Sequence, residues 1–227
     1  MAIHQIVRYV RPYAEAKENM LDRLRRGSFE FTEYEVAAAV FDRLTSLDRD
    51  AWAAAFMEVA RPYEERAQEA EARGDIAAAQ QDYLRAYGYY RLGRYPAPNS
   101  PGKRASYQRS VQNYLRAAPW FDPPLERVEI PFQGRPGGGD RVIGYFRRPP
   151  SPLPSPPGGS RESEGIPILV GWGGIDGFKE ELRADAYLAR GIAVLALDNA
   201  GVGEAPIAGS EDAERMWDAV LDRKSVV

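Results

Sequence analysis

The residues with the clearest chemical potential lie in one short stretch, LVGWGGIDGFKEE, from Leu169 to Glu181. An apolar run there ends in glycines and an aspartate, and charged residues follow. Glycines leave the backbone bare, so a ligand can come close to its N–H groups. Such groups bind a phosphate or stabilise the negative oxygen of a tetrahedral intermediate. The stretch therefore predicts an anion-binding turn at the end of a strand.

Two phosphate-binding patterns fit this turn poorly. It lacks the Lys-Ser/Thr pair of a P-loop. In the dinucleotide pattern G-x-G-x-x-G, Gly171 and Gly173 fill the first two positions, but the third falls on Asp176. A second glycine-rich turn, DNAGVGEAP, also lacks the full pattern. An oxyanion hole is the favoured alternative to a nucleotide site.

The elements that position this turn follow from apolar periodicity. The runs IPILVGW and GIAVLALD are apolar on both faces and flank FKEELRADAYLAR, which is predicted to be helical, so they indicate a parallel βαβ unit. Before them, alternating patterns predict an antiparallel hairpin of Leu125–Phe132 with Arg141–Arg147. A last helix is expected over about Ser210–Leu221.

Residues 1–121 are predicted to form a helical domain, and residues 122–227 form the α/β part. Gly74-Asp75 predicts a helix stop followed by an N-cap, and Ser100 is expected to cap a helix that has Pro101 in its first turn. Residues 63–96 resemble one tetratricopeptide-type hairpin, but a helix pair within one domain is favoured because no second copy follows. The tyrosines of this segment are expected in the core rather than in a pocket: Tyr83, Tyr87, Tyr89 and Tyr90.

Residues 147–165 are rich in proline, glycine and serine and have no apolar periodicity. They predict a flexible surface loop that tolerates deletion, with Arg161 as the first site of proteolysis. The alternative is a proline-rich ligand for a partner domain.

The two glycine turns carry a family resemblance. GWGGIDGFKEE followed by YLARGIAVLALDNAGVGEAP resembles α/β-hydrolases of the group that includes 2,6-dihydroxypseudooxynicotine hydrolase and the fermentation-respiration-switch esterase-like proteins. The resemblance is specific over Ile168–Pro206 and only architectural over the helical part. It implies an α/β fold, with a helical N-terminal domain followed by the first half, about four strands, of the hydrolase sheet.

The same resemblance implies roles for residues of the turns. Gly174 and Ile175 are the oxyanion-hole candidates, with the Ile175 N–H as the specific donor. Gly173, Asp176 and Asp198 are expected to brace the turns, Asp176 by capping a helix that starts near Phe178. Lys179, Glu180 and Glu181 are expected to form the solvated first turn of that helix.

The residues that perform hydrolysis in this group are not found. No G-x-S-x-G occurs, and neither Ser160 nor Ser210 has the pattern. The one histidine, His4, is expected to have a surface or capping role. We therefore predict no catalytic nucleophile, acid or histidine in this chain and no activity of the chain alone. The chain has no cysteine, and neither a metal site nor a cofactor is predicted.

These features predict the N-terminal portion of a serine-dependent α/β-hydrolase that acts on a small ester or on a C–C bond next to a carbonyl. The helical part, residues 1–121, is expected to be a lid or cap-like domain that covers the active site and shapes specificity. The alternative is a non-catalytic helical interaction module fused to a degenerate hydrolase half. A small acyl or carbonyl molecule is the expected partner of the full-length protein. The net charge of −3 argues against nucleic acid, and the absence of a long apolar run argues against a membrane, so a cytoplasmic location is expected. The strand IPILVGW is expected to lie at a sheet edge that promotes self-association.

Overall fold

The computed structural model describes residues 12–134, 138–150, 166–209 and 212–222. The chain divides into two compact units, Met1–Asn113 and Tyr114–Val227. The division falls inside one helix, before the boundary at residue 121 that the sequence suggested. His4, Ser160, Arg161 and Ser210 lie outside the described residues, so the predictions made for them remain predictions.

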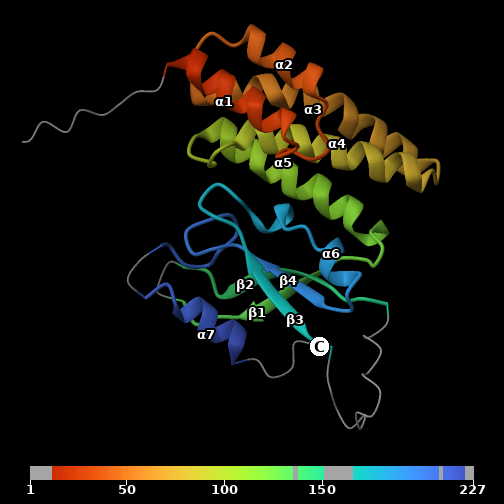
Figure 1. Cartoon of the computed structure of the whole chain (residues 1–227), viewed down its shortest axis with the longest axis vertical. Helices are drawn as coiled ribbons and strands as arrows, with labels where there is room; N and C mark the ends of the chain where they lie inside the picture. Colours follow the sequence, from red (N-terminus) through yellow and green to blue (C-terminus); the bar gives the residue numbers. More distant parts are fainter. Residues whose placement is uncertain (1–11, 135–137, 151–165, 210–211, 223–227) are drawn as a thin grey trace, which may run out of the picture. The chain divides into compact units, whose positions relative to one another are not determined.

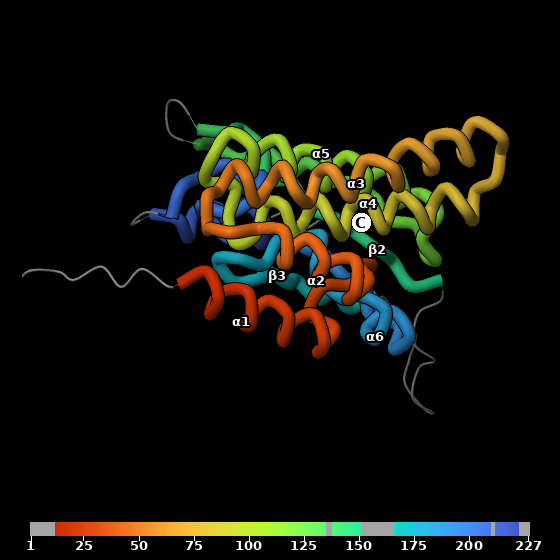
Figure 2. Tube along the Cα trace, turned by 90° about the horizontal axis from the view of Figure 1, so that it is seen from above, coloured from red at the N-terminus to blue at the C-terminus, as the bar shows by residue number. Residues whose placement is uncertain are grey.

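The first unit is helical, as expected. Its elements are α1 (Tyr13–Arg25), α2 (Tyr34–Arg43), α3 (Arg49–Ala72), α4 (Ile76–Arg94) and most of α5 (Pro101–Ala117). The long helices α3 and α4 lie side by side (Figure 1 and Figure 2). The indole Nε1 of Trp52 on α3 donates to the Leu92 carbonyl of α4 at 2.8 Å, which fixes the two helices against each other.

The predicted helix starts are confirmed. The Asp75 carboxylate accepts the Ala78 N–H at 3.2 Å at the start of α4, and Gly74 before it has a φ of +77°. The Ser100 hydroxyl accepts the Lys103 N–H at 3.3 Å at the start of α5. Each cap satisfies an N–H group that has no partner within its own helix.

The tyrosine stripe of α4 belongs to the core. Tyr83, Tyr87, Tyr89 and Tyr90 are each no more than 3% exposed. The Tyr90 hydroxyl donates to Glu64 at 2.6 Å, and Glu64 also pairs with Arg109 at 2.9 Å. The prediction that these rings pack inside the helical domain is therefore confirmed.

The second unit contains a four-stranded mixed sheet in the order β1-β2-β4-β3 (Figure 1). Its strands are β1 (Glu126–Pro131), β2 (Arg141–Arg147), β3 (Ile168–Trp172) and β4 (Ala193–Leu197). β1 and β2 pair antiparallel and β3 pairs parallel with β4, which confirms both sequence predictions. Among the described strands, β3 pairs only with β4 and forms an edge; self-association through this edge remains a prediction.

The two faces of the sheet alternate along each strand. On β4, Leu195 and Leu197 join a core cluster with Met216 and Val220 of α7 (Arg215–Leu221). Val194 faces the opposite side and packs with residues of α6 (Asp185–Leu188) and the segment before it. Every residue of β4 is buried, as expected for a strand that is covered on both faces.

The connection between β3 and β4 differs from the expected helix. The long helix predicted from near Phe178 is replaced by a single 3₁₀ turn, η2 (Lys179–Glu181), and by the four-residue helix α6. Phe178 and Leu182, on either side of η2, are both extended. The last helix is also shorter than predicted, because α7 begins at Arg215.

Candidate functional site

The turn that follows β3 is folded back tightly on itself. The Gly177 N–H donates to the Gly174 carbonyl at 3.4 Å. A Cβ atom on Gly173 would lie 2.3 Å from the Gly177 carbonyl oxygen, so a side chain at Gly173 cannot be accommodated. Glycine at this position therefore has a steric reason.

The tip of this turn presents bare backbone. A Cβ on Gly174 would meet only the Asp176 carboxylate, at 3.6 Å, so the space around it is open. The Ile175 residue is 84% exposed. Within the described part of the chain, no hydrogen bond from the Ile175 N–H is present. The turn thus offers an unoccupied donor beside a glycine.

Lys179, immediately after the turn, is the centre of a buried ion cluster. The residue is only 1% exposed. Its Nζ lies 2.7 Å from Asp198 Oδ2, 2.8 Å from Glu204 Oε2 and 3.2 Å from Glu180 Oε1. It also lies 4.8 Å from the centre of the Tyr145 ring. The expectation of a solvated first turn is therefore wrong for Lys179 and Glu180, which is 7% exposed.

Asp198, at the end of β4, joins the two glycine turns. Its Oδ1 accepts the Lys179 N–H at 2.9 Å, and its Oδ2 accepts the Glu204 N–H at 2.9 Å. Gly203 has a φ of +56°, and a Cβ on it would lie 2.2 Å from Asp198 Oδ2. Because the C-terminal ends of parallel strands meet at one edge of a sheet, β3 and β4 bring these turns together.

Three carboxylates surround the Lys179 ammonium group, and one of them, that of Glu204, also pairs with Arg127 at 3.5 Å. The Glu180 Oε1 and Glu204 Oε2 atoms are within ion-pair distance of Lys179 Nζ, but neither is aligned for a hydrogen bond. Burial raises the pKa of Glu180, the Asp198 charge raises it further, and the Lys179 charge opposes both effects. Burial also raises the pKa of the Tyr145 hydroxyl above its ordinary value, and the Glu180 charge adds to this effect.

The raised pKa of Glu180 predicts that protonation stabilises the fold. The folded chain binds this proton more tightly than the unfolded chain, so stability falls as pH rises from the ordinary Glu range through the raised pKa. We expect Glu180→Gln to reduce that fall. Urea unfolding at about pH 5 and pH 8 measures the difference, with Glu126→Gln on the exposed face of β1 as the control. An equal pH dependence in wild type and Glu180→Gln would contradict the prediction.

The part that Lys179, Glu180 and Glu204 play in this site was not predicted from the sequence. Their signal was present: charged residues follow two glycine turns at the ends of neighbouring parallel strands. Asp176 has no α-helix to cap, because residues 179–181 form a 3₁₀ turn. The bracing roles of Gly173, Asp176 and Asp198 remain proposals.

The described residues contain neither a candidate metal-binding group nor a candidate membrane-spanning helix. In residues 12–134, 138–150, 166–209 and 212–222, no group of three or more His, Asp or Glu is arranged to hold a metal ion. Across the same ranges, no helix combines the length and apolar character needed to cross a membrane.

Comparison with known proteins relates this architecture to hydrolases. The α/β hydrolase ucsC of an Acremonium species is 30% identical over 93% of this chain and 45% of the relative. The α/β hydrolase gkaG of Penicillium citrinum is 32% identical over 78% of this chain and 39% of the relative. The chain thus spans less than half the length of these curated relatives. No family model matches the sequence.

Two solved structures share the fold. The 2,6-dihydroxy-pseudo-oxynicotine hydrolase superimposes with a TM-score of 0.63 and 24% identity, over 91% of this chain and 52% of that protein. AbyA5 superimposes with a TM-score of 0.59 and 23% identity, over 90% of this chain and 51% of that protein. Both matches extend over the helices and the four-stranded sheet, and at this level of identity they establish the architecture alone.

Proposed function

We propose that the turn after β3 forms the oxyanion-binding wall of a hydrolase site, because this chain is a partial α/β-hydrolase. The observation that carries the proposal is the exposed Ile175 amide, which is free within the described residues and stands beside the open backbone of Gly174. A backbone N–H stabilises the oxygen that becomes negative when a carbonyl is attacked. The reaction proposed is serine-dependent hydrolysis of an ester, or of a C–C bond next to a carbonyl.

The ion cluster supports this role by holding the turn in place. Lys179 follows the turn directly, and its backbone N–H and its Nζ are both bound by Asp198. An oxyanion donor is effective only when it is fixed before the reaction, because no energy is then spent on reorienting it. Lys179 and Asp198 are thus positioning residues, since both are buried and bonded to each other.

The helical unit is proposed to cover the substrate and to select it, with a small acyl or carbonyl molecule as the substrate class. The nucleophile and base have to come from outside these 227 residues, since the sequence contains no G-x-S-x-G and its one histidine is His4. The relatives are about twice as long as the matched region, which leaves room for both groups.

We expect the 227-residue chain alone to hydrolyse p-nitrophenyl acetate no faster than an albumin control. Loss of triad members typically removes several orders of magnitude in rate. A fluorophosphonate probe is expected to label no serine of this chain, because no serine lies in the activating motif.

The complementary experiment assays a longer protein, encoded by the gene read beyond the codon of Val227, with the same ester and probe. A longer protein that carries G-x-S-x-G and a downstream histidine is expected to hydrolyse the ester and to be labelled at one serine. Specific labelling and turnover by the 227-residue chain would contradict the expected inactivity. A longer protein with the motif but without activity would favour the non-catalytic helical interaction module instead.

A further inference from the structure

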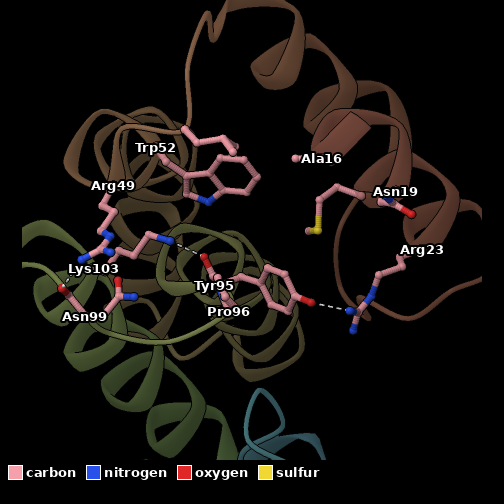
Figure 3. A pocket seen from close by; sticks show the side chains of 11 residues that line it. Ala16, Asn19, Arg23, Arg49, Trp52, Tyr95, Pro96, Asn99 and Lys103 are labelled. Atoms are coloured by element: carbon pink, nitrogen blue, oxygen red, sulfur yellow. Dashed lines mark hydrogen bonds between the residues drawn. The ribbon is translucent and has the colours of Figure 1, made fainter. Parts of the chain in front are cut away.

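The helical unit contains a cavity of about 420 Å³ between α1, the start of α3 and the segment that joins α4 to α5 (Figure 3). This volume is within the usual range of small-molecule sites, about 300–1,000 Å³. All the described residues that line it belong to the first unit. The lining combines apolar and cationic side chains, chiefly Met20, Arg23, Arg49, Trp52, Tyr95 and Lys103.

The apolar part of the cavity is a pair of fixed aromatic rings. Trp52 is 5% exposed, and its orientation is set by the hydrogen bond from Nε1 to the Leu92 carbonyl. The Tyr95 hydroxyl accepts a hydrogen bond from Arg23, and its ring meets Phe29 edge-on at 5.4 Å. Figure 3 shows Trp52 and Tyr95 on neighbouring sides of the cavity. Rings held in this way provide flat surfaces against which a planar ligand can pack.

The polar part of the cavity is positively charged. Lys103 is only 5% exposed, and its Nζ donates to the Tyr95 carbonyl and lies 5.6 Å from the Trp52 ring centre. An ammonium group has three donors, and no other hydrogen bond of this Nζ is present among the described residues. Arg49 lies beside Lys103 on one side of the cavity, and Arg23 lies on the opposite side, next to the Tyr95 hydroxyl (Figure 3).

None of the described residues that line the cavity is Asp or Glu. The nearby Asp50 is already bound, by Ser100 and by the Gly102 N–H at 2.8 Å. Burial, together with the charges of Arg49 and Arg94, lowers the pKa of Lys103 to about 8, and the Asp50 charge opposes this shift. A bound anion would oppose the repulsion among these cations and favour the protonated amine.

We propose that this cavity binds a small organic anion that carries a flat ring, such as an aromatic carboxylate. The ring packs between Trp52 and Tyr95, while the anionic group accepts hydrogen bonds from Lys103 and Arg49. A purely structural void would be expected to have an apolar lining, whereas here buried and rim cations converge on one space. The inference goes beyond the oxyanion role and does not depend on it.

The test compares two probes of the same shape, 2-naphthoate and its neutral analogue 2-naphthamide, by isothermal titration calorimetry on the whole chain. We expect 2-naphthoate to bind at least about tenfold more tightly, because charge-assisted hydrogen bonds are the stronger ones. The Trp52 indole N–H signal in an NMR titration is expected to shift with both probes. Equal affinities, or no binding of 2-naphthoate at millimolar concentration, would overturn the proposal.

Variants assign the preference to the cavity. Lys103→Met is expected to remove most of the preference for the anion while the amide still binds, and Arg49→Gln on the exposed rim is expected to reduce it several-fold. Arg61→Gln, exposed on the same helix as Trp52 but outside the cavity, is the control and should leave both affinities unchanged. Arg49 is exposed, so Arg49→Gln is expected to fold. It therefore tests the proposal even if Lys103→Met does not fold. Retention of the full preference in Arg49→Gln and in folded Lys103→Met would place the anion elsewhere.

Discussion

Replacement of Lys179 with methionine is expected to lower the free energy of unfolding of the second unit by about 3–5 kcal/mol. The substitution keeps the approximate length of the side chain and removes its charge. It removes the cation that Glu180 and Asp198 share, while Glu204 keeps its pairing with Arg127. The side chains of Lys179 and Asp198 are almost fully buried. Removal of one partner of a buried ion pair is costly, because the remaining charge has neither water nor a counterion.

Chemical unfolding followed by tryptophan fluorescence measures this loss, since Trp120, Trp172 and Trp217 all belong to the second unit. Arg141→Gln is the matched control, because Arg141 pairs with Glu129 at 2.8 Å at the surface and its side chain is 57% exposed. Its effect is expected to be much smaller. A Lys179→Met loss no larger than that of the control would disprove the structural role of the cluster.

A second substitution tests the cause of that loss. Glu180→Gln in the Lys179→Met background removes one of the carboxylates that shared this cation, so the double variant is expected to be more stable than Lys179→Met alone. Residues in direct contact normally show such coupling. Strict additivity of the two substitutions would indicate that lost packing, rather than charge, explains the effect.

In a catalytically complete form of this protein, Ile175→Pro is expected to reduce kcat by about 10²–10³-fold. Proline removes the backbone N–H that is proposed to bind the oxyanion. The preceding residue is Gly174, which tolerates the backbone restriction that proline imposes on its neighbour better than other residues do. KM is expected to change little, because the donor acts mainly on the transition state.

Ile175→Ala is the matched control for this prediction. It keeps the N–H and changes only a residue that is 84% exposed, so kcat is expected to stay close to that of the wild type. Initial rates with p-nitrophenyl acetate at saturating concentration give both values. A folded Ile175→Pro variant with nearly unchanged kcat would require another oxyanion donor.

The two predictions are linked through Lys179. If the cluster holds the turn in place, partial loosening of the cluster by Glu180→Gln should leave the turn intact, whereas loss of Lys179 should lower both stability and kcat. Comparison of the two variants at a temperature where both remain folded separates positioning from global unfolding.

The features that depend on interactions between neighbouring residues could be predicted from the amino-acid sequence. The stop and caps at Gly74-Asp75 and Ser100 located the end of α3 and the starts of α4 and α5, and alternation located the hairpin of β1 and β2. The continuous apolar runs identified β3 and β4 as a parallel pair. The glycine turn was also visible, because the steric need at Gly173 arises within four residues of the chain. Interactions between residues that are close in the sequence can be recognised in the sequence itself.

Which charged side chains are buried depends on contacts between residues far apart in the sequence, and only the folded chain shows them. K-E-E after a glycine turn has the composition of a solvated helix start, which is why the sequence predicts one there. The partners of Lys179 are Asp198 and Glu204, which come from the next strand and the turn after it. Once Asp198 binds both the N–H and the Nζ of Lys179, the segment forms a short 3₁₀ turn between extended residues rather than a long helix. The same holds for the cavity: Arg23, Trp52 and Lys103 lie far apart in sequence, and only the packing of the helices brings them together.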